Sequence, residues 1–506
     1  MRTSIRGGWV IGHQNGAHTL EQDAEVVYED GVILYVGPHF DGTVGEVIDA
    51  TGMLVAPGFI DTHVHTGHRA SHRLITDAGR PDYFGQPFLE ISVPKEGKRI
   101  EGDVRYLRPD EPGAEDEIDF NAAFTVTEML RNGITTFVEF GSQLRIQNAL
   151  ARQCEKLGIR GYLGPGYDSG RWVGDEKGRL KRIMNEEEGL KGLQEAIRFI
   201  EEKDGSAGGL VRGLLSPREA ETTSVDLLKR TRAAADEMGV PIATHAAYSV
   251  LEFHEVVREY RMTPIELLDS VGLLRPTLNI GHGNFVSDNM RMNYSGGSDL
   301  KLMGDAGVSI SHCPINIVRR ARSLDSWKKY QEAGVNISLG SDTYPRDTIL
   351  NMRSASYHGK IMSHNYRHAT AGEVFSAATL GGARSVGRDD LGRLQPGACA
   401  DIILIDLSGG DTLRFGPILD PVKSLVECGV GDDVNTVIVN GVVRMRDRKI
   451  PGVDIPALRR RAQETGEHIW RHWHESDPLG RTVREASPWS FCPACFRDQQ
   501  LARPEA

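Results

Sequence analysis

Short apolar segments alternate with longer stretches of helical pattern through the middle of the chain. Each apolar segment has four to seven residues, which is typical of strands buried on both faces of a parallel sheet. Strands that alternate with helices favour an α/β fold, and eight of them favour a (β/α)8 TIM barrel over an open sheet. The eight predicted strands are Phe59–His65, Thr135–Phe140, Gly161–Gly164, Val211–Leu215, Ile242–His245, Leu278–His282, Val308–His312 and Val335–Leu339.

The two ends of the chain carry strands broken by tight turns. Ala24–Tyr28 and Val32–Gly37 flank Glu29-Asp30-Gly31, which is a hairpin signal. Strand patterns return late in the chain, at Asp401–Asp406 and Thr436–Val443. We expect these end segments to form one small β-sandwich domain. The predicted organisation is a first sandwich half at 1–56, the barrel at 57–394, a second sandwich half at 395–450, and a C-terminal helix and tail at 451–506.

The segments between the predicted strands carry helix start and stop signals. Thr263–Glu266 has an N-cap threonine, a proline at the first helical position and a glutamate at the third, which is a capping box. Asp226–Met238 precedes Gly239, a typical C-terminal cap. Thr66–Glu117 is too long for a plain connection, so we expect a substrate-shaping lid there. A final helix is predicted from Ala457 to His474.

The composition is that of an ordinary globular protein with an acidic balance. Its 506 residues are 39% hydrophobic and 25% charged, with a net charge of −11 and a pI near 5.9. This balance argues against a nucleic-acid partner, which needs a basic face. No apolar run reaches the roughly 20 residues of a membrane helix, and the N-terminus lacks the pattern of a signal peptide. Six cysteines form no disulfide framework in a chain this long, so we expect a cytoplasmic protein without a membrane partner.

Five of the predicted strands end on residue types that bind metal ions. The carboxyl ends of barrel strands meet at one mouth, where barrel enzymes keep their active sites. Residues two apart in a strand face the same side, so the two histidines of the first strand can share one ion. An N/O donor set suits zinc, iron, manganese or cobalt. We predict one divalent metal ion, zinc before the others, held by three imidazoles and one carboxylate: His63, His65, His245 and Asp342.

Such a site predicts hydrolytic chemistry on a small molecule. A divalent ion lowers the pKa of bound water toward about 7 and so yields hydroxide at neutral pH. Asp342 is the candidate to take a proton from this water and pass it to the leaving group. His282, on the sixth strand, is the candidate to polarise the substrate. The alternative is that these are ordinary polar residues of a barrel top, which their joint occurrence on successive strand ends disfavours.

Three motifs extend this pattern, namely Pro57–His65, Ser311-His312-Cys313-Pro314 with Asn316, and Gly392–Asp401. In them the chain resembles the amidohydrolase superfamily over residues 1–445, and within it the branch of triazine hydrolases and cytosine-deaminase-like enzymes. The resemblance implies one metal ion held by the four ligands named above, with the sixth-strand histidine assisting catalysis. It also implies a homo-oligomer. Relatives with two metals carry a modified lysine on the fourth strand, and Val211–Leu215 contains no lysine.

Tyr248 departs from the pattern of that branch. Deaminases of the branch that the chain resembles have a glutamate three residues after the fifth-strand histidine, where it protonates a ring nitrogen. Here His245 is followed by Ala-Ala-Tyr. A phenol with a pKa near 10 donates a hydrogen bond but carries protons poorly at neutral pH. Tyr248 is therefore either a catalytic hydrogen-bond donor or a packed aromatic. Glu219 and Glu252 are candidates to replace the missing carboxylate, although we expect both to be solvated charges.

These features predict an amidohydrolase that uses a metal-bound hydroxide to cleave a C–N bond of a small amide, urea, carbamate or cyclic imide. The alternative is a deaminase or dehalogenase of an N-heterocycle of triazine, purine or pterin type. A third hypothesis, a non-catalytic scaffold, is disfavoured because no metal ligand is missing. His312 and Asn316 are predicted to bind substrate or to support Asp342. Cys492 and Cys495 could form a small zinc site or remain free thiols.

Overall fold

The computed structural model describes residues 1–67, 114–175, 177, 179–409, 413–476, 480–487 and 489–491. Most of the predicted lid, and both Cys492 and Cys495, lie outside the described residues. The chain divides into two compact units. The first comprises Met1–His68, Ile118–Arg171 and Met184–Asp454. In the second, the described residues include helices α16 (Ile455–Ser476) and α17 (Val483–Ala486), whose apolar side chains pack together.

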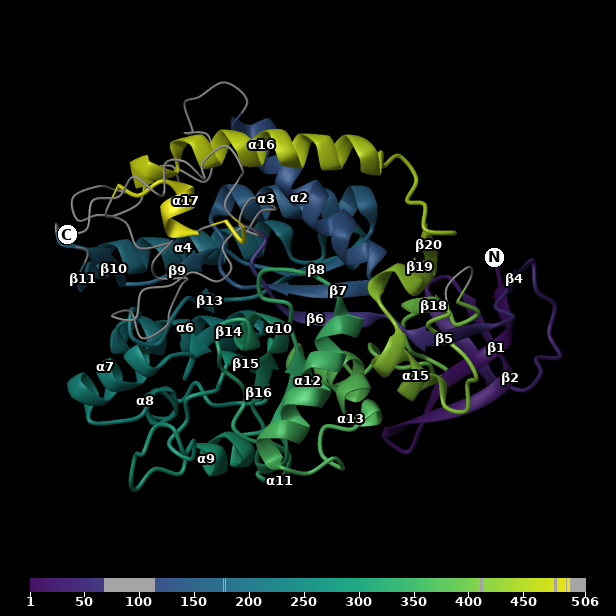
Figure 1. The fold of residues 1–506 in the computed structure, drawn as a ribbon, viewed down its shortest axis with the longest axis horizontal. Helices are drawn as coiled ribbons and strands as arrows, with labels where there is room; N and C mark the ends of the chain where they lie inside the picture. The colour runs from purple at the N-terminus through teal and green to yellow at the C-terminus, as the bar shows by residue number, and fades with distance from the viewer. Residues whose placement is uncertain are drawn as a thin grey trace. The chain divides into compact units, whose positions relative to one another are not determined.

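Strands from both ends of the chain form one eight-stranded sheet in the first unit, where purple and yellow-green ribbons lie side by side (Figure 1). Its order is β20-β19-β18-β5-β1-β2-β3, with β4 beside β1. A shared core of apolar side chains from early and late strands holds it together, including Ile5, Val26, Val55, Ile402 and Ile438. The strands are β1 (Thr3–Gln14), β2 (Ala17–Glu29), β3 (Val32–Gly37), β4 (Glu46–Asp49), β5 (Met53–Pro57), β18 (Ile402–Asp406), β19 (Val434–Val439) and β20 (Val442–Met445).

Two parallel four-stranded sheets carry the middle of the chain. The first has the order β12-β8-β7-β6 and the second β14-β15-β16-β17. Isolated parallel bridges join the two sheets at both edges, through Val64 and Asp342 and through Leu215 and Ile242. The strands are β6 (Phe59–Val64), β7 (Ile134–Glu139), β8 (Arg160–Leu163), β12 (Val211–Gly213), β14 (Ile242–Ala246), β15 (Leu278–His282), β16 (Ser309–His312) and β17 (Asn336–Leu339).

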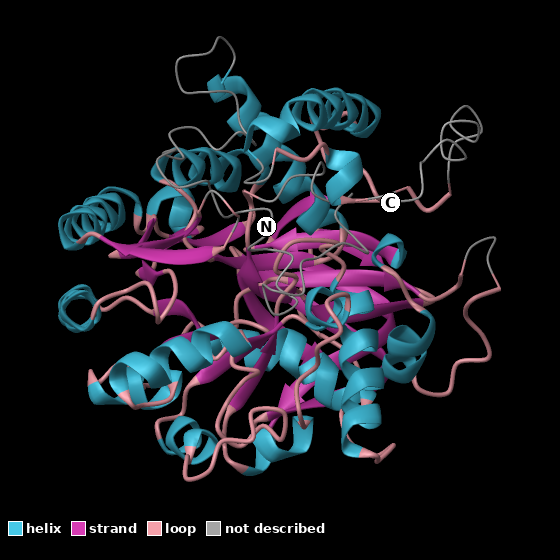
Figure 2. Cartoon of the chain, turned by 60° about the vertical axis from the view of Figure 1, so that its left-hand side comes forward, coloured by secondary structure: helices cyan, strands magenta, loops and turns pink. Residues whose placement is uncertain are grey.

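Helices follow these strands and lie on their outer side (Figure 2). The helices of the first unit are α2 (Ala114–Arg131, whose first residues belong to the second unit), α3 (Leu144–Leu157), α4 (Glu186–Lys203), α5 (Ser206–Gly209), α6 (Val225–Met238), α7 (Val250–Tyr260), α8 (Pro264–Ser270), α9 (Asp299–Asp305), α10 (Pro314–Val318), α11 (Trp327–Glu332), α12 (Thr348–Ser363), α13 (Ala371–Ser376), α14 (Gly382–Ser385) and α15 (Pro421–Cys428). Short elements complete the chain: β9 (Gly166–Tyr167), β10 (Gly170–Gly174), β11 (Leu180–Met184), β13 (Ser216–Pro217), the π turn η3 (Ala377–Gly381) and the 3-10 turn η4 (Gly431–Asp433).

Each of the eight predicted central strands overlaps an observed one, and the predicted α/β alternation is confirmed. The capping box at Thr263 and the left-handed cap at Gly239, with φ of 67°, are both present. The early hairpin is confirmed as antiparallel β2 and β3. Among the described helices, none is both long and apolar enough to cross a bilayer.

Candidate active site

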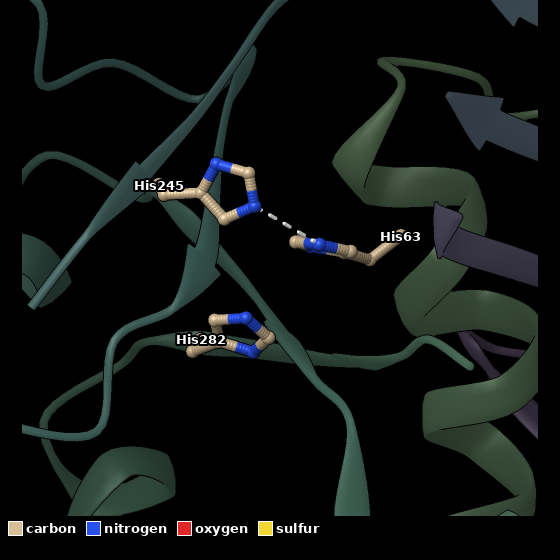
Figure 3. Close-up of side chains that lie close together, drawn as sticks. All are labelled: His63, His245 and His282. Atoms are coloured by element: carbon tan, nitrogen blue, oxygen red, sulfur yellow. Dashed lines mark hydrogen bonds between the residues drawn. The ribbon is translucent and has the colours of Figure 1, made fainter. Parts of the chain in front are cut away.

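Three histidine rings converge where β6 and β14 end. The Nε2 atoms of His63 and His65 are 3.1 Å apart, those of His65 and His245 are 3.1 Å apart, and those of His245 and His63 are 3.3 Å apart. Figure 3 shows the rings of His63 and His245 turned toward each other, with the ring of His282 beside them. His63 is fully buried, and its ring stacks on Phe140 at a centroid distance of 3.8 Å. The predicted histidines therefore form one cluster.

Burial favours the neutral form of the His63, His245 and His282 imidazoles. The pKa values of His63 and His282 lie well below the usual value, first because of burial and then because of the neighbouring histidines. Burial also lowers the pKa of His245. The Nδ1 atom of His245 lies 2.8 Å from the carbonyl oxygen of Arg218, to which it donates its proton. Its Nε2 atom therefore presents a lone pair to the cluster, as a metal ligand must.

Asp342 and His282 complete the cluster, and both residues have a left-handed backbone conformation. Their φ angles are 60° and 79°, a region that costs a non-glycine residue about 1–3 kcal/mol and that is concentrated at functional sites. Asp342 lies with Oδ1 3.7 Å from His65 Nε2 and Oδ2 3.4 Å from His282 Nε2. Its backbone N–H donates to the His63 carbonyl and its own carbonyl accepts from the His65 N–H. The turn after β17 is thus fixed to the end of β6.

The donor atoms fit a single divalent metal ion. Four ligands in a tetrahedron around zinc, at the usual distance of about 2.0–2.1 Å, stand about 3.3 Å apart. The three Nε2 separations of 3.1–3.3 Å match that edge. Three overlapping groups among the described residues have donor atoms within 4.8 Å of one another: His63, His65 and Asp342; His63, His245 and His282; and His282, Cys313 and Asp342. Nitrogen and carboxylate oxygen also suit zinc chemically.

Asn316 lies against Asp342. Its side-chain amide donates to Asp342 Oδ2, and Thr343 Oγ1 donates to its Oδ1 at 3.2 Å. This arrangement corresponds to the supporting role that the sequence left open. His312 is buried and packs edge-on against Trp327, with ring centroids 6.2 Å apart. Its burial and the nearby His358 lower its pKa to about 3, and the structure does not bring its ring into the histidine cluster.

Glu221 is a residue that the sequence analysis missed. The Tyr248 hydroxyl donates to Glu221 Oε1 at 2.5 Å, and Glu221 is buried. The expectation that Glu252 is a solvated charge is wrong, because it is fully buried and its carboxylate accepts the N–H groups of Ala247, Tyr248 and Ser249 at the start of α7. The sequence signal for Glu221 was its place two residues after Glu219, in the loop that follows the fourth predicted strand.

Glu219 is also only partly exposed, with 25% of its side chain accessible. Its Oε1 lies 4.0 Å from His245 Nδ1, and Thr222 Oγ1 donates to its Oε2 at 3.1 Å. Burial, followed by the charge of Asp168, raises its pKa to about 7. It faces the edge of the His245 ring that points away from the cluster.

Residues 54–444 match the family model described as amidohydrolase family. This span covers most of the chain. The chain belongs to the amidohydrolase family. As a member it is a hydrolase that acts on C–N bonds, and the predicted resemblance is confirmed.

Relatives named as deaminases match most of this amidohydrolase chain. It is 28% identical over 464 residues to a 5-methylthioadenosine/S-adenosylhomocysteine deaminase of Natronomonas pharaonis, covering 91% of this chain and 96% of that one. It is 27% identical over 453 residues to a 5'-deoxyadenosine deaminase of Methanosarcina barkeri, covering 88% and 94%.

Solved structures share the fold. An adenosine deaminase from Xanthomonas campestris with bound zinc has a TM-score of 0.74 at 20% identity, covering 92% of this chain and 98% of that chain. An atrazine chlorohydrolase from Arthrobacter aurescens complexed with zinc also has a TM-score of 0.74, at 22% identity, covering 92% and 100%. These likenesses show that the chain has the amidohydrolase fold.

Proposed function

We propose that this amidohydrolase is a metal-dependent deaminase of an amino-substituted N-heterocycle. The observation that carries the proposal is the convergence of three imidazole Nε2 atoms within 3.1–3.3 Å beside the Asp342 carboxylate. The substrate class comes from the relatives, which are named as deaminases of adenosine derivatives. The relatives therefore favour the alternative of the sequence analysis, deamination of an N-heterocycle. They do not favour its main prediction, the hydrolysis of an amide, urea, carbamate or cyclic imide.

The proposal includes the architecture that surrounds the site. We infer that the two four-stranded sheets are halves of one (β/α)8 barrel, because bridges join them at both edges. We also infer that the eight-stranded sheet folds over its shared core as the small sandwich domain. The domain limits at 56, 394 and 450 remain predictions.

In this function His63, His65, His245 and Asp342 hold one divalent ion, zinc in our proposal. When bound, the ion supplies a Lewis acid and lowers the pKa of a water molecule toward about 7. Asp342 accepts one proton from the attacking water and gives it to the leaving amino group, which departs as ammonia. The water oxygen bonds to the ring carbon first, and the bond from that carbon to the amino nitrogen then breaks. Neutral His282 orients the substrate beside Asp342.

Metal analysis and a substrate panel test the proposal together. Purified protein should contain about one equivalent of divalent metal and release ammonia from at least one aminopurine, aminopterin or aminotriazine. His63→Ala should lose both metal and activity, whereas His254→Ala, at an exposed position on α7, should keep both. Full activity in metal-free protein, or no ammonia from any amino-heterocycle, contradicts the proposal.

Tyr248 favours a second candidate function. Tyr248 is a phenol where deaminases of this branch have a glutamate. Cleavage of an amide, urea, carbamate or cyclic imide needs no protonation of a ring nitrogen, so it does not need that glutamate. Adding amides, ureas, carbamates and cyclic imides to the panel separates the two functions by the substrate consumed and the product formed, since deamination replaces a ring amino group by oxygen and leaves the ring closed.

A further inference from the structure

We propose that Tyr248 and Glu221 act as one proton-carrying unit that replaces the glutamate of related deaminases. The inference rests on the proposed deamination and assigns its ring-nitrogen proton donor. Tyr248 is the catalytic residue that touches substrate, and Glu221 is the positioning residue that acts through it. The sequence objection to deamination was the missing carboxylate, and Glu221 supplies one from a different loop.

The contact between the two residues has the geometry of a relay. Tyr248 follows β14, and its ring lies edge-on to that of His245 with centroids 6.0 Å apart. Its hydroxyl contacts Glu221 Oε1 at 2.5 Å. Tyr248 is partly exposed, whereas Glu221 is only 1% exposed and lies on the loop after β13. The phenol is therefore the more accessible member of the pair.

The other two glutamates near Tyr248 are less suited to this role. Both carboxylate oxygens of Glu252 accept backbone N–H groups, Oε1 from Ala247 at 2.8 Å and Oε2 from Tyr248 at 2.7 Å. It is therefore committed to holding the start of α7. Glu219 lies at the Nδ1 edge of the His245 ring, 4.0 Å away, while the metal cluster lies at the Nε2 edge. Only Glu221 among the three contacts the phenol oxygen in the described residues.

The surroundings of Tyr248 favour a stored proton. Its facing groups are Glu219, Glu221 and Glu252, with Arg322 Nη1 donating to its backbone carbonyl at 3.5 Å. The Glu252 carboxylate accepts three backbone N–H groups, which favour its charged form. Glu221 is buried near this charge, so in the proposed unit the stored proton is on Glu221.

The proton transfers balance. As the water oxygen bonds to the ring carbon, the C=N electron pair moves to the ring nitrogen, which takes the Tyr248 proton while Glu221 returns one to the phenol. One proton of the water passes through Asp342 to the amino group, and ammonia leaves. The second proton of the water is released as the new carbonyl forms, and it restores the proton on Glu221. Tyr248 ends each cycle unchanged.

Four variants test the unit: Tyr248→Phe, Glu221→Gln, their combination, and the exchange Tyr248→Glu with Glu221→Tyr. Each single change should lower kcat by about 10²- to 10⁴-fold, the usual contribution of general acid catalysis. Metal content should stay at about one equivalent, and KM should change less than kcat. The combination should be no worse than the worse single variant, because the two groups act together. The exchange keeps the hydroxyl–carboxylate contact and should recover at least tenfold over Tyr248→Phe.

Tyr167→Phe is the matched control, because the Tyr167 hydroxyl is bonded to Thr231 Oγ1 at 2.9 Å and lies outside the cluster. It should keep wild-type kcat, and thermal unfolding should show that every variant folds. Glu221→Gln should also change the pH profile of kcat, which a purely structural role would leave in place. Unchanged kcat and pH profile in Glu221→Gln, or single losses that multiply in the combination, overturn the inference alone. A wild-type enzyme that releases no ammonia from amino-heterocycles overturns the proposed function and the inference with it.

Discussion

Asn316→Ala should weaken metal binding while leaving every proposed ligand in place. The Asn316 amide donates to Asp342 Oδ2, and both residues are buried. A hydrogen bond to a charged group contributes about 1.5–3 kcal/mol, and loss of such a supporting contact typically lowers metal affinity about 10- to 100-fold. We expect a loss of that size, because water has little access to replace the missing N–H donor.

The same substitution should move the pH dependence of activity in a defined direction. Burial raises the pKa of Asp342, whereas the Asn316 contact lowers it by stabilising the carboxylate. Without that contact the pKa of Asp342 rises further. The carboxylate is then protonated at a higher pH, so the acidic limb of the kcat/KM profile should move to higher pH.

Competition with a coloured chelator measures the metal affinity, and thermal unfolding of metal-free protein checks the fold. Thr343→Val is the graded control, since it removes only the neutral hydroxyl that donates to Asn316 Oδ1. It should cost about 0.5–1.5 kcal/mol of metal binding, or about 2- to 10-fold. If Asn316→Ala binds metal as tightly as wild type and keeps its pH profile, the assignment of Asp342 as a supported metal ligand is wrong.

Three further predictions concern stability. Leu404→Ala, in the shared core of the eight-stranded sheet, should lower the free energy of unfolding by about 2–5 kcal/mol, as measured by denaturant titration. Ser249 is the N-cap of α7 and forms a capping box with Glu252. Ser249→Ala should lower the free energy of unfolding by about 1 kcal/mol in the same titration. Burial raises the pKa of Glu219 to about 7, above its value in the unfolded chain. Between about pH 4.5 and 7 the folded protein therefore binds more protons here than the unfolded chain does, so its stability falls as the pH rises. Glu219→Gln should therefore flatten the dependence of Tm on pH at constant metal, and an identical slope in both proteins would contradict this.

The strands and the cluster of histidines and aspartate at their ends could be predicted because both depend on local pattern. Buried parallel strands are continuous apolar runs, as every position of β6 and β14 is buried. The rule that barrel strands end at one mouth then brought together residues as distant as His63 and Asp342. The left-handed backbone of Asp342 also has a counterpart in the sequence, since aspartate tolerates a positive φ better than most residues do.

The contact between Tyr248 and Glu221 could not be predicted in this way. The two residues are 27 positions apart, and the loop conformation after β13, which no periodicity encodes, brings them together. Glu252 was misjudged for a related reason. A glutamate three residues after a serine signals a capping box, but the pattern does not say whether the helix start is exposed or buried.

The pairing of β5 has a consequence for how the protein is made. β5 leads directly into β6 and its histidines, and it pairs with β18 at five positions but with β1 at only two. While the ribosome is still synthesising the chain, the segment before His63 lacks its main partner until about residue 406 has emerged. A nascent chain released before that point lacks β18, so β5, which leads into the histidine strand, keeps only its two-position pairing with β1.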